Sequence, residues 1–130
     1  MKSYTVLAAI ITIVAAIGNV NAVQAGGHLG AYKLENSSNV PIYYQYKWGE
    51  SSEWQTGCVH PGQAMCHTIP LDEDGRASIP YVRFDCVAGD DDVTYRTYEL
   101  DFYSTCYTCG GKPYAFSYSA CGHYLNLYSK

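Results

Sequence analysis

Cysteine is the most reactive residue type in this 130-residue chain, and it occurs at six positions. An even number of cysteines in an exported protein favours disulfide bonds, although six leave many pairings open. We therefore expect three disulfides. The six positions are Cys58, Cys66, Cys86, Cys106, Cys109 and Cys121.

Spacing narrows the possible pairs. Cys58 and Cys66 flank the turn signal Pro61-Gly62 and would face each other if their two strands formed a hairpin. Opposed Cβ atoms in a hairpin lie about 4.5–5.5 Å apart, which suits a disulfide. We therefore expect this pair to be bonded. The full predicted set is Cys58–Cys66, Cys106–Cys109 and Cys86–Cys121.

Other uses of the same sulfur atoms stay open. Cys121 could instead bond one cysteine of the Cys106-x-x-Cys109 pair. A zinc site could form from Cys106, Cys109, Cys121 and His123, because three thiolates and an imidazole suit tetrahedral zinc. A redox pair needs a helix N-terminus to lower a thiol pKa, and Gly110-Gly111 after the CxxC does not supply one. Because export favours oxidised thiols, we predict disulfides and no metal or cofactor.

The remaining titratable residues form no catalytic motif. A hydrolase needs a nucleophile, a base and an orienting carboxylate, and neither Gly-x-Ser-x-Gly nor His-Glu-x-x-His is present. We expect His67 to be solvent-facing or a partly buried hydrogen-bonding residue. The acidic runs at 72–74 and 90–92 offer oxygen ligands for Ca²⁺ but lack the EF-hand spacing, so we expect solvated turns. The chain is predicted not to be an enzyme.

Aromatic residues are the main candidates for ligand binding. Tyrosine occurs 14 times and tryptophan twice, while charged residues make up only 15% of the chain. Exposed aromatic rings on a flat sheet stack on sugar rings or anchor protein partners. High β-propensity alone is the competing explanation for so many tyrosines. The predicted binding face consists of Trp48, Trp54, Tyr43, Tyr44 and Tyr46.

A two-residue alternation of apolar and polar side chains organises the chain into strands. The stretch 40–69 reads as strand, turn, strand, turn, strand, with Ile42 and Tyr44 on one face and Tyr43 on the other. Turn residues separate about seven or eight such segments, which favours an antiparallel β-sandwich. One further strand is expected to begin near Tyr32, and others are expected over 79–86, 93–105, 114–119 and 123–128.

The first 22 residues have the pattern of a helical secretory signal peptide. Lys2 precedes the apolar stretch 6–17, and Val20-Asn21-Ala22 fits the small-residue cleavage rule, with a second possible site after Ala25. The apolar run is short of the roughly 20 residues that a membrane span needs. We therefore expect residues 23–130 to form a single domain that is secreted, periplasmic or attached to the cell surface.

Several motifs occur in an order that resembles a family of small uncharacterised secreted bacterial β-rich proteins. They are Tyr44-x-Tyr46-x-Trp48-Gly49, Trp54, Pro61-Gly62, His67, Arg83-Phe84-Asp85, Lys112-Pro113-Tyr114-x-Phe116 and Tyr124-Leu125-x-Leu127-Tyr128. The resemblance covers most of the mature chain and implies a compact exported β domain. It assigns no activity or catalytic residue, and the cysteines are not part of the pattern.

These features together predict a secreted, non-catalytic binding or adhesion module for a carbohydrate or protein ligand. The formal net charge is −4 and no Lys/Arg cluster occurs, which argues against nucleic acid or a basic membrane-binding patch. The alternative is a structural coat or fibre subunit that assembles through sheet edges, because little charge is present to prevent edge pairing. A small metal-dependent hydrolase is the least favoured prediction.

Overall fold

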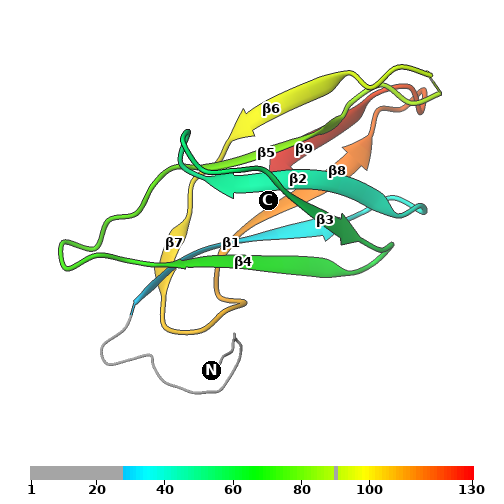
Figure 1. Ribbon diagram of the computed structural model, residues 1–130. Coiled ribbons are helices and arrows are strands. Elements are labelled where there is room, and N and C mark those ends of the chain that lie inside the picture. The colour runs from blue at the N-terminus through cyan, green and yellow to red at the C-terminus, as the bar shows by residue number, and fades with distance from the viewer. Residues whose placement is uncertain (1–27, 90) are drawn as a thin grey trace.

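The computed structural model describes residues 28–89 and 91–130, which form two packed β-sheets (Figure 1). The predicted signal peptide, residues 1–22, and both cleavage sites lie outside the described residues. Within the described part, no helix is long and apolar enough to cross a membrane. The strands are β1 (Leu29–Asn36), β2 (Ile42–Trp48), β3 (Gln55–Val59), β4 (Ala64–Pro70), β5 (Pro80–Asp85), β6 (Tyr95–Glu99), β7 (Tyr103–Thr105), β8 (Lys112–Tyr118) and β9 (Leu125–Ser129).

The alternation in the sequence decides which side of each strand is buried. In β2, Ile42 and Tyr44 are buried while Tyr43, between them, is exposed. In β5, Val82 and Phe84 are buried and Arg83 lies on the other face. An extended chain sends successive side chains to opposite faces, so a period of two produces one apolar face per strand. The predicted all-β sandwich is confirmed.

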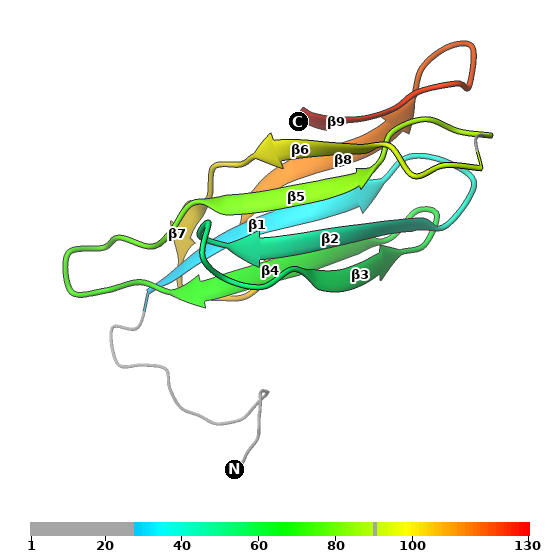
Figure 2. The same cartoon turned by 45° about the horizontal axis from the view of Figure 1, so that its top comes forward.

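The two sheets have the strand orders β4-β1-β8-β9, with β7 also paired to β1, and β3-β2-β5-β6. Figure 2 shows the second sheet lying over the first. Strand pairs are antiparallel with one exception, because β1 and β8 run parallel from Tyr32↔Lys112 to Asn36↔Phe116. This parallel pair joins two strands that are far apart in the sequence, and the alternation pattern contains no sign of it.

The turn at His60–Gln63 connects two sheets rather than two paired strands. Its geometry is as expected, since Gln63 N–H donates to the His60 carbonyl at 3.0 Å and Gly62 has a φ of +75°. However, β3 pairs with β2, while β4 pairs with β1. Cys58 and Cys66 therefore lie in different sheets, and the prediction that they are bonded is wrong.

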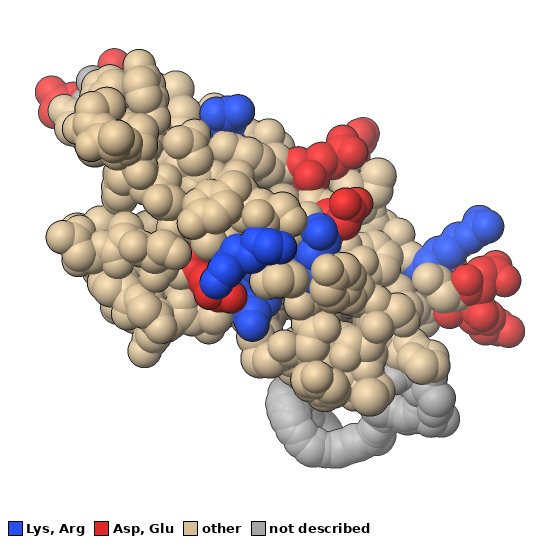
Figure 3. All heavy atoms as spheres, turned by 180° about the vertical axis from the view of Figure 1, so that it is seen from behind, with Lys and Arg blue, Asp and Glu red and all other residues tan. Residues whose placement is uncertain are grey.

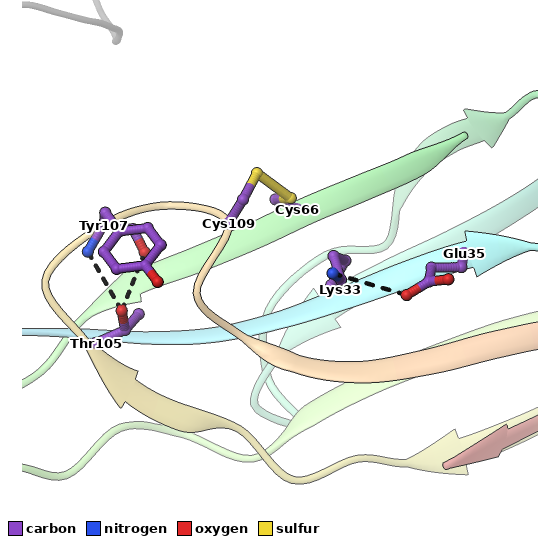
Figure 4. The surroundings of a disulfide bond; sticks show 6 residues. All are labelled: Lys33, Glu35, Cys66, Thr105, Tyr107 and Cys109. Atoms are coloured by element: carbon purple, nitrogen blue, oxygen red, sulfur yellow. Dashed lines mark hydrogen bonds and ion pairs between the residues drawn. A yellow bond between two sulfur atoms is a disulfide. The ribbon is translucent and has the colours of Figure 1, made fainter. Parts of the chain in front are cut away.

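One disulfide joins Cys66 of β4 to Cys109 of the loop between β7 and β8, with the two Cα atoms 5.3 Å apart (Figure 4). It replaces the predicted Cys106–Cys109 bond, which is therefore also wrong. The other four cysteines are not disulfide-bonded, so the predicted Cys86–Cys121 bond is wrong as well, and the expected three bridges are reduced to one within the described residues. These four are Cys58, Cys86, Cys106 and Cys121.

The same disulfide removes one ligand from the alternative zinc site. Cys109 is bonded to Cys66, so it offers no thiolate beside Cys106, Cys121 and His123. Among the described residues, no three His, Cys, Asp or Glu side chains come together in a metal-binding group.

The predicted single strand over 93–105 is divided between the two sheets. Its first part is β6, which pairs with β5, and its last part is β7, which pairs with β1. Leu100 lies between them and is buried, and the N–H of Asp101 donates to the hydroxyl of Tyr114 at 2.8 Å. The chain crosses between the sheets here while Leu100 stays in the core. The alternation of apolar residues therefore continues through the crossing, and the sequence gives no sign that the strand ends.

Aromatic rings fill much of the space between the sheets. Phe84 of one sheet meets Phe116 of the other edge to face, with ring centroids 5.1 Å apart. The core also takes the side chain of Asn36, which donates to the carbonyls of Val40 and Val59 and accepts from Ser38. The Asn36 amide is therefore fully engaged in hydrogen bonds within the fold.

The disulfide yields the first prediction. It closes a loop with a sequence separation of 43 residues. A closed loop of that size restricts the unfolded chain by about 4 kcal/mol at 25 °C. We expect Cys109→Ser to lower the free energy of unfolding in urea by about 2–4 kcal/mol. Cys106→Ser removes an exposed thiol from the same loop and should change it by less than about 0.5 kcal/mol. Equal losses in the two variants would contradict the assigned bond.

Candidate binding face

The predicted aromatic binding face is divided by the fold between core and surface. Tyr44 is only 2% exposed, and the half-buried Tyr46 and Trp48 pack against the core. The Trp48 ring lies 5.4 Å from that of Tyr32 and 5.7 Å from that of Phe102. These three residues share the inward face of β2, so their assignment to an outer binding face is corrected.

Tyr43 and Trp54 are the two members of the predicted set that belong to the outer face. Tyr43 is 69% exposed and lies opposite Cys58 on β3. Trp54 comes directly before β3 and is half-buried, with the cationic groups of Lys47 and Arg83 over its ring. Two of five predicted residues are therefore on one surface, that of the β3-β2-β5-β6 sheet.

Cations and aromatic rings alternate along this surface. The Lys47 Nζ lies 4.6 Å from the centre of the Trp54 ring and 5.8 Å from that of Tyr81. The Arg83 guanidinium lies 4.3 Å from the centre of the Trp54 ring and 4.5 Å from that of Tyr95. All four distances are within the range of a cation–π attraction. We call these five residues, Tyr81, Lys47, Trp54, Arg83 and Tyr95, the aromatic–cationic ladder.

Strand register brings the ladder together from three separate parts of the chain. β2 and β5 are antiparallel neighbours in which Lys47 lies opposite Tyr81 and Gln45 opposite Arg83. Tyr95 enters from β6, where it lies opposite Asp85. Residues on one face of neighbouring strands have Cβ atoms about 4.5–5.5 Å apart, or 7–8 Å on the diagonal, so long side chains meet there.

The Arg83 side chain is fixed in position without an acidic partner. Its Nε donates to Oε1 of Gln45 at 2.7 Å, and aromatic rings flank the guanidinium. Among the described residues, ion pairs are found only for Lys33 and Lys130, both with Glu35. A guanidinium has five N–H donors, so most of the donors of Arg83 have no protein acceptor in the described structure.

Acidic residues lie at the two ends of the ladder. The Tyr81 hydroxyl donates to Glu50 at 3.4 Å, and burial together with the charge of Glu50 raises the Tyr81 pKa. At the other end, the Asp85 carboxylate accepts the backbone N–H groups of Val87 and Thr94. The face is therefore positive at its centre and negative at its rim.

The opposite outer face has a different character. Figure 3 views the molecule from behind and shows basic and acidic atoms gathered together in the middle of a mostly uncharged surface. Lys33 and Lys130 both pair there with Glu35, and the hydrogen bond from Lys130 lowers the Glu35 pKa. These two cations are paired with a carboxylate, unlike Arg83.

His67 is a buried hydrogen-bonding residue, one of the two roles expected for it. Its Nε2 lies 2.7 Å from the Tyr44 hydroxyl, and its ring centre lies 4.0 Å from that of Tyr46. Burial lowers the His67 pKa to about 4 and raises the pKa values of Tyr44 and Tyr32. The imidazole is thus neutral at physiological pH. It lies in the core and contributes packing and a hydrogen bond.

The acidic turn at 72–74 is used locally. An oxygen of Asp72 accepts the backbone N–H groups of Asp74 and Arg76, which closes the turn around Gly75. Of the second acidic run, Asp90 lies outside the described residues, and Asp91 and Asp92 are exposed.

The sequence-based set missed Lys47, Tyr81, Arg83 and Tyr95. Alternation indicated that each of them lies on the polar side of its strand, but it did not show that β2, β5 and β6 are neighbours. Comparison of the chain with protein families, curated proteins and solved structures finds no match. The resemblance to a family of secreted bacterial proteins therefore stays a prediction.

The buried imidazole predicts a loss of stability in acid. The ordinary His pKa is 6.5, and that of folded His67 is about 4, so only the unfolded chain binds a proton between these values. Stability is therefore full above pH 6.5 and falls as the pH drops to 4. We expect protonation of this histidine in the unfolded chain to lower the free energy of unfolding by about 3 kcal/mol at pH 4.

Urea unfolding at pH 7, 5.5 and 4 measures this effect against His67→Gln, which keeps a hydrogen-bonding side chain but does not titrate. Carboxylates titrate alike in both proteins, so the difference in pH dependence isolates His67. An unchanged pH dependence in His67→Gln would contradict the neutral buried imidazole.

Proposed function

We propose that this chain is an exported, non-catalytic binding module whose ligand docks on the outer face of the β3-β2-β5-β6 sheet. The observation that carries the proposal is the aromatic–cationic ladder, a continuous row of rings and cations that the core does not use. Tyr43 and Tyr95, which are 69% and 50% exposed, extend the same surface. Aromatic rings of this kind anchor sugars and protein partners because they contribute a large contact area with little loss of side-chain entropy.

The disulfide supports the proposed export of this chain. The Cys66–Cys109 disulfide is a bond that persists in oxidising compartments and is rare in the cytosol. It agrees with the signal-peptide pattern of residues 1–22 and with a place outside the cell, in the periplasm or at the cell surface. A carbohydrate is the ligand class that best fits a flat row of rings, and a protein surface is the other.

The rings need not move to receive a ligand. Arg83 is held by Gln45 and is flanked by Trp54, which comes directly before β3, and by Tyr95 of β6, so the surface is already ordered. An ordered surface loses less conformational entropy on binding, which favours affinity. The ligand would contact Trp54 at the centre and the exposed tyrosines around it.

Binding to a glycan array tests this function. We expect Trp54→Ala to weaken binding by about tenfold or more, since a central aromatic anchor contributes about 1–2 kcal/mol or more of binding free energy. Tyr128→Ala is the matched control, because Tyr128 is 46% exposed but belongs to the other sheet. Equal loss in both variants would contradict the proposed binding face, and a folded protein that binds no glycan would exclude a carbohydrate as its ligand.

A second candidate is a coat or fibre subunit that assembles through sheet edges. Edge strands β3, β4 and β9 have the sequences QTGCV, AMCHTIP and LNLYS, without a single Lys, Arg, Asp or Glu. Proteins commonly place charges on edge strands to prevent pairing with another chain. These three edges lack that protection, whereas the remaining end strand, β6, carries Arg96 and Glu99.

Light scattering at increasing concentration tests assembly. If edges pair, we expect particle size to grow with concentration and Asn126→Lys, on β9, to prevent the growth by placing a charge on the edge. The same substitution should leave glycan binding unchanged, since β9 belongs to the other sheet. A monomer at all concentrations would exclude this candidate.

A further inference from the structure

The ladder contains a cation, Arg83, that has no carboxylate partner among the described residues. Arg83 is half-buried, and the Trp54 and Tyr95 rings lie 4.3 and 4.5 Å from its guanidinium carbon. Its only hydrogen bond in the described structure is the one from Nε to Gln45. The two ring contacts and this single bond hold the group in position and leave the donors on its two terminal nitrogens without an acceptor in the described structure.

A guanidinium held in this way is suited to one kind of ligand group. Its terminal N–H donors lie in one plane and match the two oxygens of a carboxylate. Flanking rings lower the local dielectric, so the charge-assisted hydrogen bonds are stronger than they would be in water. Gln45 orients the donors in advance, which lowers the entropy lost on binding.

The rim of the face selects among anionic ligands. Glu50, Asp85 and Glu99 lie on or beside the outer face, near the ends of the ladder, whereas Lys47 and Arg83 lie at its centre. A densely charged polyanion would approach these three carboxylates and be repelled. A ligand with isolated negative charges can place one of them at Arg83 and uncharged sugar surface over the rings.

We propose that the face binds an acidic glycan of the uronic-acid type, in which the carboxylate of one sugar pairs with Arg83 while the neighbouring rings lie over Trp54 and Tyr95. This proposal rests on the binding function above and adds the class of ligand. Lys47 donates to the carbonyl of Glu50 at 2.9 Å and lies over Trp54, so it supports the positive centre without replacing Arg83.

A uronic-acid oligosaccharide and its carboxyl-reduced counterpart form the test pair, because the two differ only in the charged group. Binding of each oligosaccharide is measured by calorimetry on the protein as it is obtained after export, with no part of the domain removed. We expect the acidic form to bind at least about tenfold more tightly, the size of one charge-assisted contact. Raising the salt concentration should reduce this preference.

Three variants assign the preference to a residue. Arg83→Met keeps an apolar stem between the rings but removes the charge, so it should bind both oligosaccharides equally. Arg83→Lys should retain part of the preference, since it keeps the charge but not the planar donors. Arg96→Met is the matched control, because Arg96 is an exposed arginine of the same sheet outside the ladder, and it should behave like the unmodified protein.

The outcomes separate this inference from the function on which it rests. Equal affinity of the unmodified protein for both oligosaccharides overturns the acidic-glycan assignment and leaves a neutral-glycan module intact. No binding of either form, together with a silent glycan array, overturns the carbohydrate-binding function on which the inference rests. Tighter binding of a densely sulfated glycan would overturn the selection of an isolated carboxylate by the acidic rim.

Discussion

Burial of one face of each strand against the opposite sheet is the constraint on which the surface chemistry of this protein depends. Tyr44, Val82 and Phe84 are buried between the sheets, and this fixes the direction of every neighbouring side chain in β2 and β5. Lys47 and Arg83 must then point outward, because successive residues of a strand alternate between faces. The ladder on the surface is thus a consequence of packing in the core.

Cation–π contacts on this surface take the place that ion pairs have in most β proteins. Charged residues make up 15% of the chain and tyrosine occurs at 14 positions, and the ion pairs among the described residues involve only Lys33 and Lys130. Lys47 and Arg83 instead pack on Trp54. Such a contact is worth about 0.5–1 kcal/mol at an exposed site, so it orders the side chains without neutralising them. The charge stays available to a ligand.

The core makes a similar use of aromatic rings around a single polar centre. His67 is enclosed by Tyr32, Tyr44 and Tyr46, and the Tyr44 hydroxyl meets its Nε2. Gly57 of β3 provides the space for this arrangement, because a Cβ there would lie 2.5 Å from the Tyr44 ring. The tyrosines of this chain therefore have two separate roles, one group packing around His67 and the other covering the outer face.

The sequence by itself determined most of the strands, their buried faces and the positions of the turns, although the predicted strand 93–105 is two strands, β6 and β7. Ile42, Tyr44, Val82 and Phe84 follow a local two-residue period, and a local pattern can be recognised without knowing the partners of a strand. Tyr43 and Trp54 lie on the outer side, whereas Tyr44, Tyr46 and Trp48, which were predicted for the same face, pack against the core. The β-sandwich class followed from the number of such segments between turns.

Only the tertiary structure decided which strands are neighbours, and the chemistry depends on that. Alternation is the same whether β3 pairs with β2 or with β4, so the sequence could not show that Cys66 meets Cys109 rather than Cys58. Nor could it show that Trp54, Arg83 and Tyr95 lie side by side. These contacts join segments far apart in the chain, and the free energy that selects them comes from the packing of the whole core.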